Sequence, residues 1–470
     1  MTYFSALPVV ETQVGIAIES VRGTPEAPDY WLPIMGPKYV PDVQLLPDAG
    51  LRGSMVTLYD EVPGLRFDSH AWDAYPFLDS FPVFLRALLG SKDKVQARTP
   101  LTTLVAEAKS PDKKIIVVEK LSEGLVVVLD EGGAEEETTT LGKETKIKAG
   151  EWEYVVVALT KKHAIGATVS GPTELVKEAV AGATVIFVPY KVEAGQYLVI
   201  GTIAGEQETV LVVGAPTESK AGEWKTNIVY PLAFTHKAKA SVVGLTGHAF
   251  SLLNNAPAEG NQPPSCTITD YAGEENWRQL ARAQLNAINI KGSADALPTV
   301  AVDWFADKAI TPAPPSATYS TAEAPPGWTA VAAIGGTQIG YMVNWEFDLK
   351  RNVKNIPGVT GNQNWYQHFA GPLEATAKVT VLEDRKALWL TAYENGELES
   401  IDLTLSDVKS GFALNLHSSS LKFIKGSLDR SKEWVEIPLE AQLIPSEADA
   451  LAGGVSPIVA TVANAVSTEY

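Results

Sequence analysis

The sequence has a single cysteine, Cys266, among its 470 residues. One cysteine excludes an intramolecular disulfide framework and suits a chain that folds in a reducing compartment. No segment reaches the roughly 18 consecutive apolar residues that a membrane-spanning helix needs. Residues 1–20 lack the basic segment that opens a secretory signal peptide. We therefore expect neither export nor membrane insertion by a signal of the chain's own.

Basic side chains are also few relative to acidic ones. The 38 Lys and Arg residues are opposed by 56 Asp and Glu residues, which gives a formal net charge of −18 and a sequence pI near 4.9. Proteins that bind nucleic acid tightly neutralise its phosphates with clustered cations, so this balance argues against such a function. It suits an ordinary acidic protein, and also a surface along which DNA slides without sticking.

The sequence motifs of common enzyme sites are absent as well. There is no His-Glu-x-x-His, no cysteine pair for zinc, no phosphate loop ending in Gly-Lys-Ser/Thr and no Gly-x-Ser-x-Gly elbow. The six histidines have no ligand-like spacing, and the acidic run Glu135–Glu137 lies in a predicted turn. We therefore predict no enzyme, no catalytic residue, no metal site and no cofactor. Carboxylate pairs, which only the fold brings together, keep an enzyme open as an alternative.

Two neighbouring stretches of the chain resemble each other. Leu104–Ala108 is matched by Leu175–Ala179, and Lys148–Trp152 is matched by Lys220–Trp224, at a nearly constant separation along the chain. Each unit consists of short β-branched runs separated by Gly-containing turns, which is typical of β-meanders. The pattern predicts two small β domains in tandem, residues 103–172 and 173–245.

A fainter duplication surrounds this pair. Ile-Lys-Gly-Ser occurs within Leu285–Ser293 and again within Ser420–Ser427, and each is followed by a strand that alternates apolar and polar residues. This pattern predicts two copies of one β domain, the first of which the tandem pair interrupts. The predicted division is a first domain made of residues 1–102 and 246–325, a second domain of residues 326–446 and a C-terminal tail of residues 447–470.

The predicted fold class is mainly β, with two sandwich or partial-barrel domains and short flanking helices. In Tyr341–Lys350, apolar residues alternate with Asn344, Glu346 and Asp348, which predicts a strand with one core face and one wet face. Residues Tyr75–Gly90 predict a short amphipathic helix with a glycine stop. Asn276–Ile288 predicts a second helix.

A long connection, Arg351–Glu374, separates two of the predicted strands. Connections of about 24 residues without structure of their own tend to be functional or to become ordered against a partner. Trp365, Tyr366 and Phe369 are poorly placed in a solvated loop and suit anchors in a partner's pocket, with Asn355 in the same segment. The alternative is a loop that folds back on its own domain.

Taken together, several segments resemble the tail tube proteins of long-tailed bacteriophages (siphophages). The resemblance covers about residues 1–100 and 260–445 and leaves out the tandem insert. The segments that carry it are Val14–Pro25, Tyr30–Ile34, Trp345–Asn352, Pro357-Gly358 and Gly371–Thr376.

The resemblance implies a structural virion protein that forms stacked rings around a channel for DNA, without binding DNA specifically or meeting a membrane. The duplication places the chain with the T5-like members, whose rings are trimers with pseudo-six-fold inner symmetry. The implied partners are further copies of the chain, the tape measure protein and the tail terminator and tip proteins, with assembly in the host cytoplasm. Under this interpretation Asn355, Trp365, Tyr366 and Phe369 lie between stacked rings. Asn344, Glu346 and Asp348 then face an acidic lumen, and the insert lies outside.

A binding or adhesion module built of tandem β domains, recognising carbohydrate or a cell surface, is the alternative function. It predicts exposed aromatic platforms on the 103–245 repeats.

Overall fold

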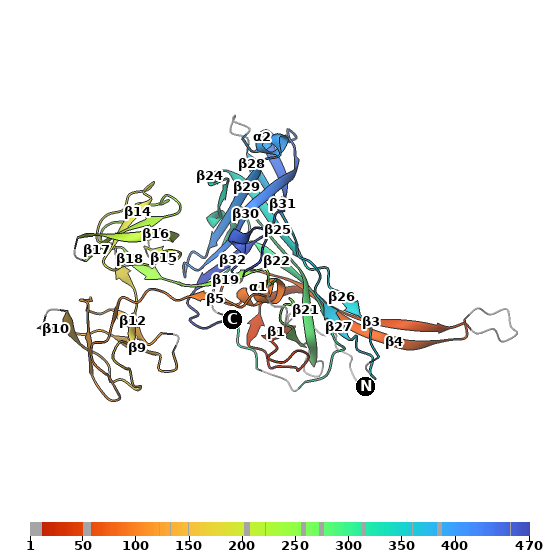
Figure 1. The fold of residues 1–470 in the computed structure, drawn as a ribbon, viewed down its shortest axis with the longest axis horizontal. Coiled ribbons are helices and arrows are strands. Elements are labelled where there is room, and N and C mark those ends of the chain that lie inside the picture. The colour runs from red at the N-terminus through yellow and green to blue at the C-terminus, as the bar shows by residue number, and fades with distance from the viewer. Residues whose placement is uncertain are drawn as a thin grey trace, which may run out of the picture.

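The structure is a computed structural model of the chain. It describes residues 12–49, 58–121, 123–131, 133–148, 150–201, 207–220, 222–254, 260–271, 277–312, 316–320, 322–359, 361–382, 388–451 and 453–470. The protein is mainly β, as predicted, with a central body, two lobes on one side and a long hairpin projecting from the other (Figure 1).

The central body contains most of the strands. They are β1 (Gln13–Ile18), β2 (Tyr30–Leu32), β3 (Ile34–Asp48), β4 (Asp60–Ala74), β5 (Lys94–Gln96), β19 (Thr246–Ser251), β20 (Cys266–Tyr271), β21 (Trp277–Ser293), β22 (Thr299–Ala306), β23 (Val331–Ile334), β24 (Thr337–Ile339), β25 (Met342–Lys350), β28 (Glu374–Leu382), β29 (Leu398–Ser406), β30 (Ala413–Gly426), β31 (Glu436–Leu443) and β32 (Val459–Asn464). A separate two-stranded ladder joins β26 (Lys354–Ile356) to β27 (Gln367–Phe369). The helical elements are α1 (Pro82–Leu89), α2 (Leu388–Asn395) and the short 3-10 turns η3 (Gly327–Thr329) and η4 (Glu447–Asp449).

The two lobes are built from the segment between β5 and β19. The first contains β6 (Thr102–Thr103), β7 (Lys114–Val117), β8 (Val126–Leu129), β9 (Glu137–Thr140), β10 (Glu144–Lys148), β11 (Glu151–Val155) and β12 (Thr168–Ser170). The second contains β13 (Thr173–Glu174), β14 (Val185–Val188), β15 (Tyr197–Ile200), β16 (Glu208–Lys220), β17 (Glu223–Ile228) and β18 (Ser241–Gly244). Each lobe has its own buried apolar cluster. Equivalent bridges join Ala108 to His163 and Ala179 to His236, so the sequence repeat recurs in the strand pairing.

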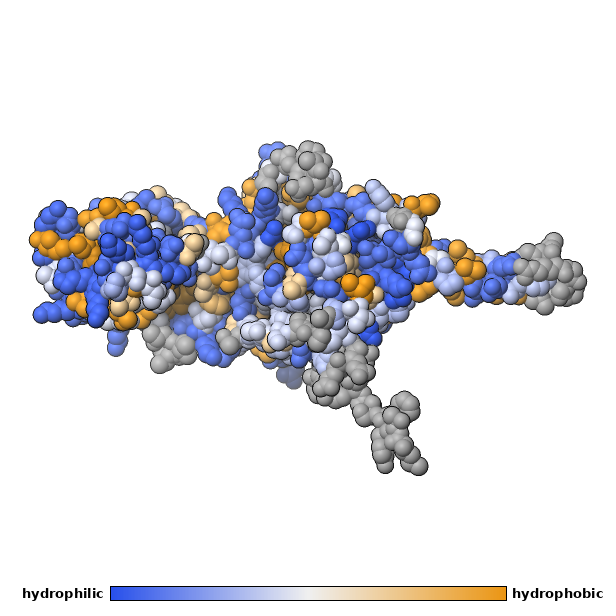
Figure 2. All heavy atoms as spheres, turned by 90° about the horizontal axis from the view of Figure 1, so that it is seen from below, coloured by the Kyte–Doolittle hydropathy of each residue, from blue (hydrophilic) through white to orange (hydrophobic). Residues whose placement is uncertain are grey.

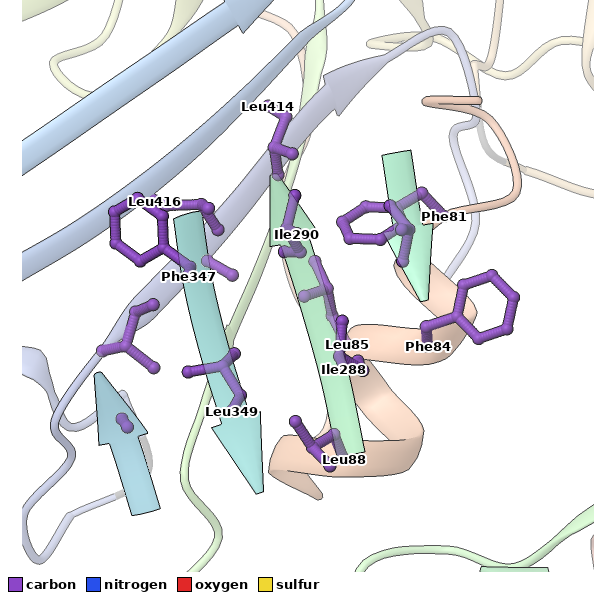
Figure 3. Close-up of a cluster of buried hydrophobic side chains, with 14 of the residues drawn as sticks. Phe81, Phe84, Leu85, Leu88, Ile288, Ile290, Phe347, Leu349, Leu414 and Leu416 are labelled. Carbon is purple, nitrogen blue, oxygen red and sulfur yellow. The ribbon is translucent and has the colours of Figure 1, made fainter. Parts of the chain in front are cut away.

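The curved sheet at the centre of the body buries one face and exposes the other. Neighbouring strands run in the order β3, β4, β22, β21, β25, β28, β31 and β30, all antiparallel. The buried face packs on α1, and its core side chains come from strands far apart in the sequence (Figure 3). Of the apolar residues in the predicted strand Tyr341–Lys350, Trp345, Phe347 and Leu349 are buried on one face, whereas Tyr341 is exposed and precedes the strand.

Helix α1 confirms the helix prediction in its second half. Pro82 opens the helix, where its missing N–H costs no hydrogen bond, and Gly90 ends it with φ of 86°. Phe81, Phe84 and Leu85 are buried against the sheet.

The second helix prediction, Asn276–Ile288, is wrong. From Trp277 onward the segment belongs to β21, a strand of 17 residues. Two β-bulges interrupt it, and each extra residue shifts the side chains to the opposite face. Core residues therefore fall three positions apart across each bulge, at Leu280 and Ala283 and again at Leu285 and Ile288, which imitates the period of a helix.

Two groups of body strands repeat the same pairing order. In the first group the pairs are β1 with β2, β1 with β20, β20 with β21, β21 with β22, β22 with β4 and β4 with β3. In the second group they are β23 with β24, β23 with β29, β29 with β30, β30 with β31, β31 with β28 and β28 with β25. Helix α1 contacts β21, and α2 contacts β30.

The bulges of β21 and β30 occupy matching positions. In each strand one bulge lies against the preceding strand, ending at Ala283 in β21 and at Leu421 in β30. The other follows Leu285 in β21 and Phe423 in β30. Both correspondences share one offset along the chain, so the two strands match residue by residue through two irregularities.

This register corrects the alignment on which the sequence argument depended. The two Ile-Lys-Gly-Ser segments start at Ile290 and Ile424. Ile290 lies opposite Val300 in a regular ladder, whereas Ile424 is itself the bulged residue. When the bulges are aligned, the counterpart of Ile290 is Leu428 and not Ile424. The tetrapeptides are therefore out of register, and the repetition is carried by topology and bulges.

Candidate functional site

The wet face of the central sheet is the first candidate site. Rows of side chains cross it at right angles to the strands, because residues directly opposite each other in a ladder are neighbours on the same face. In one row Lys291, Glu346, Lys378 and Glu440 are successive partners, and Lys425 follows opposite Glu440. Cations and carboxylates alternate along this row, so each charge has neighbours of opposite sign.

Within this row, Glu346 has side-chain donors from two neighbouring strands. The amide of Asn289 donates to it at 2.7 Å, and the ammonium of Lys378 lies 3.3 Å away. Burial works against ionisation, but the hydrogen bonds from Asn289 and Lys378 outweigh it and hold the pKa of Glu346 below its usual range. Asp348 is similarly paired with Lys350 at 2.5 Å, and Asn344 is exposed.

Acidic residues outnumber basic ones on the wet face between β4 and β31. Two shallow grooves follow this face, one over Lys291 and Lys378 and the other over Asp303 and Asp348. Its carboxylates are Asp73, Asp303, Glu346, Asp348, Glu374 and Glu440. Its ammonium groups are Lys291, Lys350 and Lys378. The part of the face from β4 to β31 is therefore net acidic, although Lys378 and Lys350 are paired with carboxylates within it. Lys38 and Lys425 line the same two grooves just beyond it.

The connection between β25 and β28 has structure of its own. Its strands β26 and β27 pair with each other, and Asn355 lies opposite His368 in that ladder. The Asn355 Oδ1 and the His368 Nδ1 are 2.6 Å apart, and the other ring nitrogen of His368 is 3.2 Å from Asp307 at the end of β22. The connection is thus fixed to strands of the first group.

The three aromatic residues of this connection differ in their surroundings. Trp365 packs edge-to-face against Phe67 of β4, with ring centroids 6.5 Å apart, and is half-buried. Tyr366 is 61% exposed and Phe369 is 38% exposed. The structure therefore separates one intrachain anchor from two side chains that a partner could reach. Contact of these residues with a stacked ring stays a prediction.

The hairpin of β3 and β4 is a feature that the sequence did not predict. It extends beyond the body (Figure 1), and apolar residues are exposed on its surface (Figure 2). These residues are Val40, Val43, Leu45, Leu46 and Val62. Both faces of the hairpin meet solvent, so its sequence lacks the alternation by which strands are recognised. The remaining signal was three prolines, Pro37, Pro41 and Pro47, which are typical of edge strands.

The two strand groups meet where β25 adds to β21. Residues 344–350 of β25 pair with residues 287–293 of β21, just beyond the point where pairing with β20 stops. One group thus extends the sheet of the other by strand addition.

A family model described as phage tail tube protein matches residues 10–463, nearly the whole chain.

The chain belongs to the phage tail tube protein family. A comparison with curated proteins found no match. Family membership makes this tail tube protein a structural component of the phage virion and implies that it is not an enzyme. Within the described ranges, no helix is long and apolar enough to cross a membrane. The same part of the tail tube protein holds no cluster of three or more His, Cys, Asp or Glu side chains suited to a metal ion.

Proposed function

We propose that this protein polymerises into stacked rings that form the phage tail tube, a conduit for DNA on its way into the host. The observation that carries the proposal is the junction of β25 with β21, where one strand group extends the sheet of the other. Among the described residues, β3 pairs only with β4, and the edge of β30 beyond Lys422 has no partner strand. Open strand edges invite pairing with another chain. Ring closure would remove those edges.

The number of chains in a ring follows from the repeated pairing order. Two equivalent groups per chain supply two of the positions around a ring, so three chains supply six. We infer a trimeric ring with pseudo-six-fold inner symmetry, as in the T5-like type. Under this proposal the two tube domains comprise residues 1–102 with 246–325 and residues 326–446, with the 103–172 and 173–245 domains on the outside.

The wet face of the sheet is the proposed channel wall. Its acidic excess would repel phosphate over a Debye length of about 8 Å at physiological salt, which keeps DNA near the axis. Its paired lysines would retard DNA less than free lysines, because a cation already bound to a carboxylate contributes less to phosphate binding. Asn344, Glu346 and Asp348 are the candidate lumen residues.

Electron microscopy and native mass spectrometry of the purified protein test the proposal. We expect rings or tubes in two-dimensional class averages, and three chains per ring by mass. Six chains per ring would overturn the inferred trimeric ring while leaving the proposed tube standing. A protein that stays monomeric at high concentration, and binds glycans through its lobes, would instead favour the adhesion module.

Further partners follow from the same proposal. A tube that ends must be capped, and its lumen must be filled before DNA enters, so we propose that the chain contacts the tape measure protein and the tail terminator and tip proteins. Assembly would take place in the host cytoplasm. Co-purification of tubes with these proteins from infected cells is the corresponding measurement.

A further inference from the structure

We propose that β3 of one chain adds to β30 of a second copy, in the register by which β25 adds to β21 within the chain. The partner is therefore another molecule of this protein. The inference rests on the proposed ring and specifies which residues meet at its closing interface.

The acceptor edge is the part of β30 beyond its pairing with β29. Within the chain, β25 occupies the edge of β21 that becomes free where pairing with β20 stops, at Ala283. In the second group the pairing of β30 with β29 stops at Lys422. Among the described residues, no strand pairs with the corresponding edge of β30 from Phe423 onward. The edge that holds β25 in one group is thus unpaired in the other.

The donor strand is β3, the counterpart of β25. β3 pairs with β4 across the hairpin, and β25 pairs with β28 across the connection that follows it. Both β3 and β25 carry a bulge near their start. β25 has a second neighbour, β21, whereas β4 is the only strand that pairs with β3 in the described part of the chain. Lys38, Val40 and Asp42 are exposed along this strand.

The ladders of the two groups fix which residues correspond on the acceptor side. Lys291 lies opposite Thr299 at the far end of the β21–β22 ladder. Asp429 lies opposite Glu436 at the same place beyond β30, where the chain continues past the end of the strand. The alignment of the bulges gives the same correspondence, so Asp429 is the counterpart of Lys291.

The donor side is fixed in the same way. Lys38 of β3 lies opposite Ala71 of β4, as Glu346 of β25 lies opposite Lys378 of β28. Within the chain, Glu346 lies opposite Lys291. Transferring this pair places Lys38 of one chain opposite Asp429 of the second copy. A charged pair therefore recurs with its signs exchanged.

The other end of the ladder is also complementary. Ala287 lies opposite Lys350 within the chain, and the same transfer places Lys425 opposite Asp42. Lys425 already bonds Glu440 at 2.7 Å, so Asp42 would continue the alternating row of the wet face into the next chain. Opposite charges fall at both ends of a register that was fixed by backbone pairing alone, and any shifted register separates both pairs.

Prolines on β3 limit which edges it can join. The amide of Arg351 donates to Asn286 on β21, so odd-numbered residues of β25 direct their N–H groups toward that neighbour. Their counterparts on β3 include Pro37 and Pro41, which have no N–H. The interface must then depend on the carbonyls of β3, the amide of Tyr39 and the charged pairs. Such an edge resists unspecific pairing and accepts a complementary one.

The projecting hairpin would be covered by the same interface. Its counterpart in the second group is the connection between β25 and β28, which packs on the first group: the Gln363 carbonyl accepts from the amide of Arg66 at 2.8 Å, and Trp365 contacts Phe67. By the same relation, the β3–β4 hairpin lies on the second group of the neighbouring chain. Its exposed apolar residues would there be removed from water.

Engineered cysteines test the register. Val40 and Ser427 fall directly opposite each other, and residues opposite in an antiparallel ladder have Cα atoms about 4.5–5.5 Å apart, within disulfide range. Oxidation of assembled V40C/S427C should yield covalent dimers and trimers on a non-reducing gel. In the control V40C/L428C the second cysteine points to the other face, so at least tenfold less cross-link is expected. The native Cys266 is buried and does not compete.

Charge exchange gives a second measurement that needs no cysteine. K38E and D429K should each raise the protein concentration at which tubes form several-fold, and K38E/D429K should restore the wild-type value. D429N controls for the turn, because Asp429 also accepts from the amide of Ser431 at 2.9 Å. If the cysteine variants do not assemble, the charge exchange alone tests the proposed register.

The outcomes separate the register from the ring. Cross-linking confined to V40C/S427C, or rescue by the double charge exchange, supports the proposed interface. The proposed interface is wrong if wild-type tubes form but the two cysteine pairs cross-link equally or not at all, and the charge exchange restores nothing. The proposed tube function would still stand. A wild-type protein that forms no ring at all refutes the proposed function itself.

Discussion

Replacing Trp365 and Tyr366 separately would distinguish an anchor within the chain from a contact between rings. Trp365 is half-buried against Phe67, whereas Tyr366 is 61% exposed. Truncating a fully buried Trp costs about 3–5 kcal/mol, so a half-buried one should cost about 2 kcal/mol, including its edge-to-face contact. An exposed Tyr should cost at most about 0.5 kcal/mol. We therefore expect W365A, and not Y366A, to loosen the connection in the free subunit.

Hydrogen exchange of the segment 354–369 measures this difference directly. Unfolding of a chain with several lobes is not one transition, so local opening is a cleaner observable than a melting temperature. A loss of about 2 kcal/mol corresponds to roughly thirtyfold faster exchange, and about 0.5 kcal/mol to roughly twofold. Y366A should instead weaken tube formation. Equal exchange in the two variants, or an unchanged rate in W365A, would refute the assignment of Trp365 as an intrachain anchor.

Three further predictions concern the insert and the channel face. A protein in which a short turn replaces residues 97–246 should still form tubes, because Gln96 and Gly247 are already opposite each other in a ladder. The prediction is wrong if circular dichroism shows that this deletion variant folds but microscopy shows that it never polymerises. E346Q should lower stability by about 0.5 kcal/mol at pH 7. Because the folded-state pKa of Glu346 lies below its unfolded value, its contribution is present above the unfolded pKa and lost as pH falls through the folded one. The free energies of local opening of β25 in E346Q and wild type, measured by hydrogen exchange and corrected for the intrinsic rate at each pH, should therefore converge in acid. E346K/D348K tubes should retain DNA, with each lumen lysine steepening the salt dependence of binding by about 0.9 in a log–log plot; an unchanged slope would place these residues outside the lumen.

The sequence predicted regular strands well and irregular ones poorly. Val300, Val302 and Trp304 alternate without interruption, and all three are buried as expected. In β21 the two bulges reset the alternation, so the period of two vanished and a helix was predicted in its place. A bulge depends on the opposite strand, which lies elsewhere in the chain, and no local pattern encodes it.

The candidate channel face was predictable only in part. A period of two places Asn344, Glu346 and Asp348 together, but it does not say which side chains lie beside them. The partners of Glu346 are Asn289 and Lys378, 57 and 32 residues away in the chain, and only the sheet register brings them together. The alternating row of charges therefore could not be predicted without knowing which strands pair and in which register.

The two strand groups differ most in the segments after their helices. After α1, residues 90–265 carry both lobes before β20 begins, whereas after α2 only Gly396 and Glu397 precede β29. A ring of six identical single-group subunits would have to carry this decoration at every position or at none. Joining two groups in one chain lets one copy carry a bulky appendage while the other keeps a short link. In the proposed three-chain ring, every second position on the outer wall would carry no lobes. The lobes would then have more space than in a ring that carried them at every position.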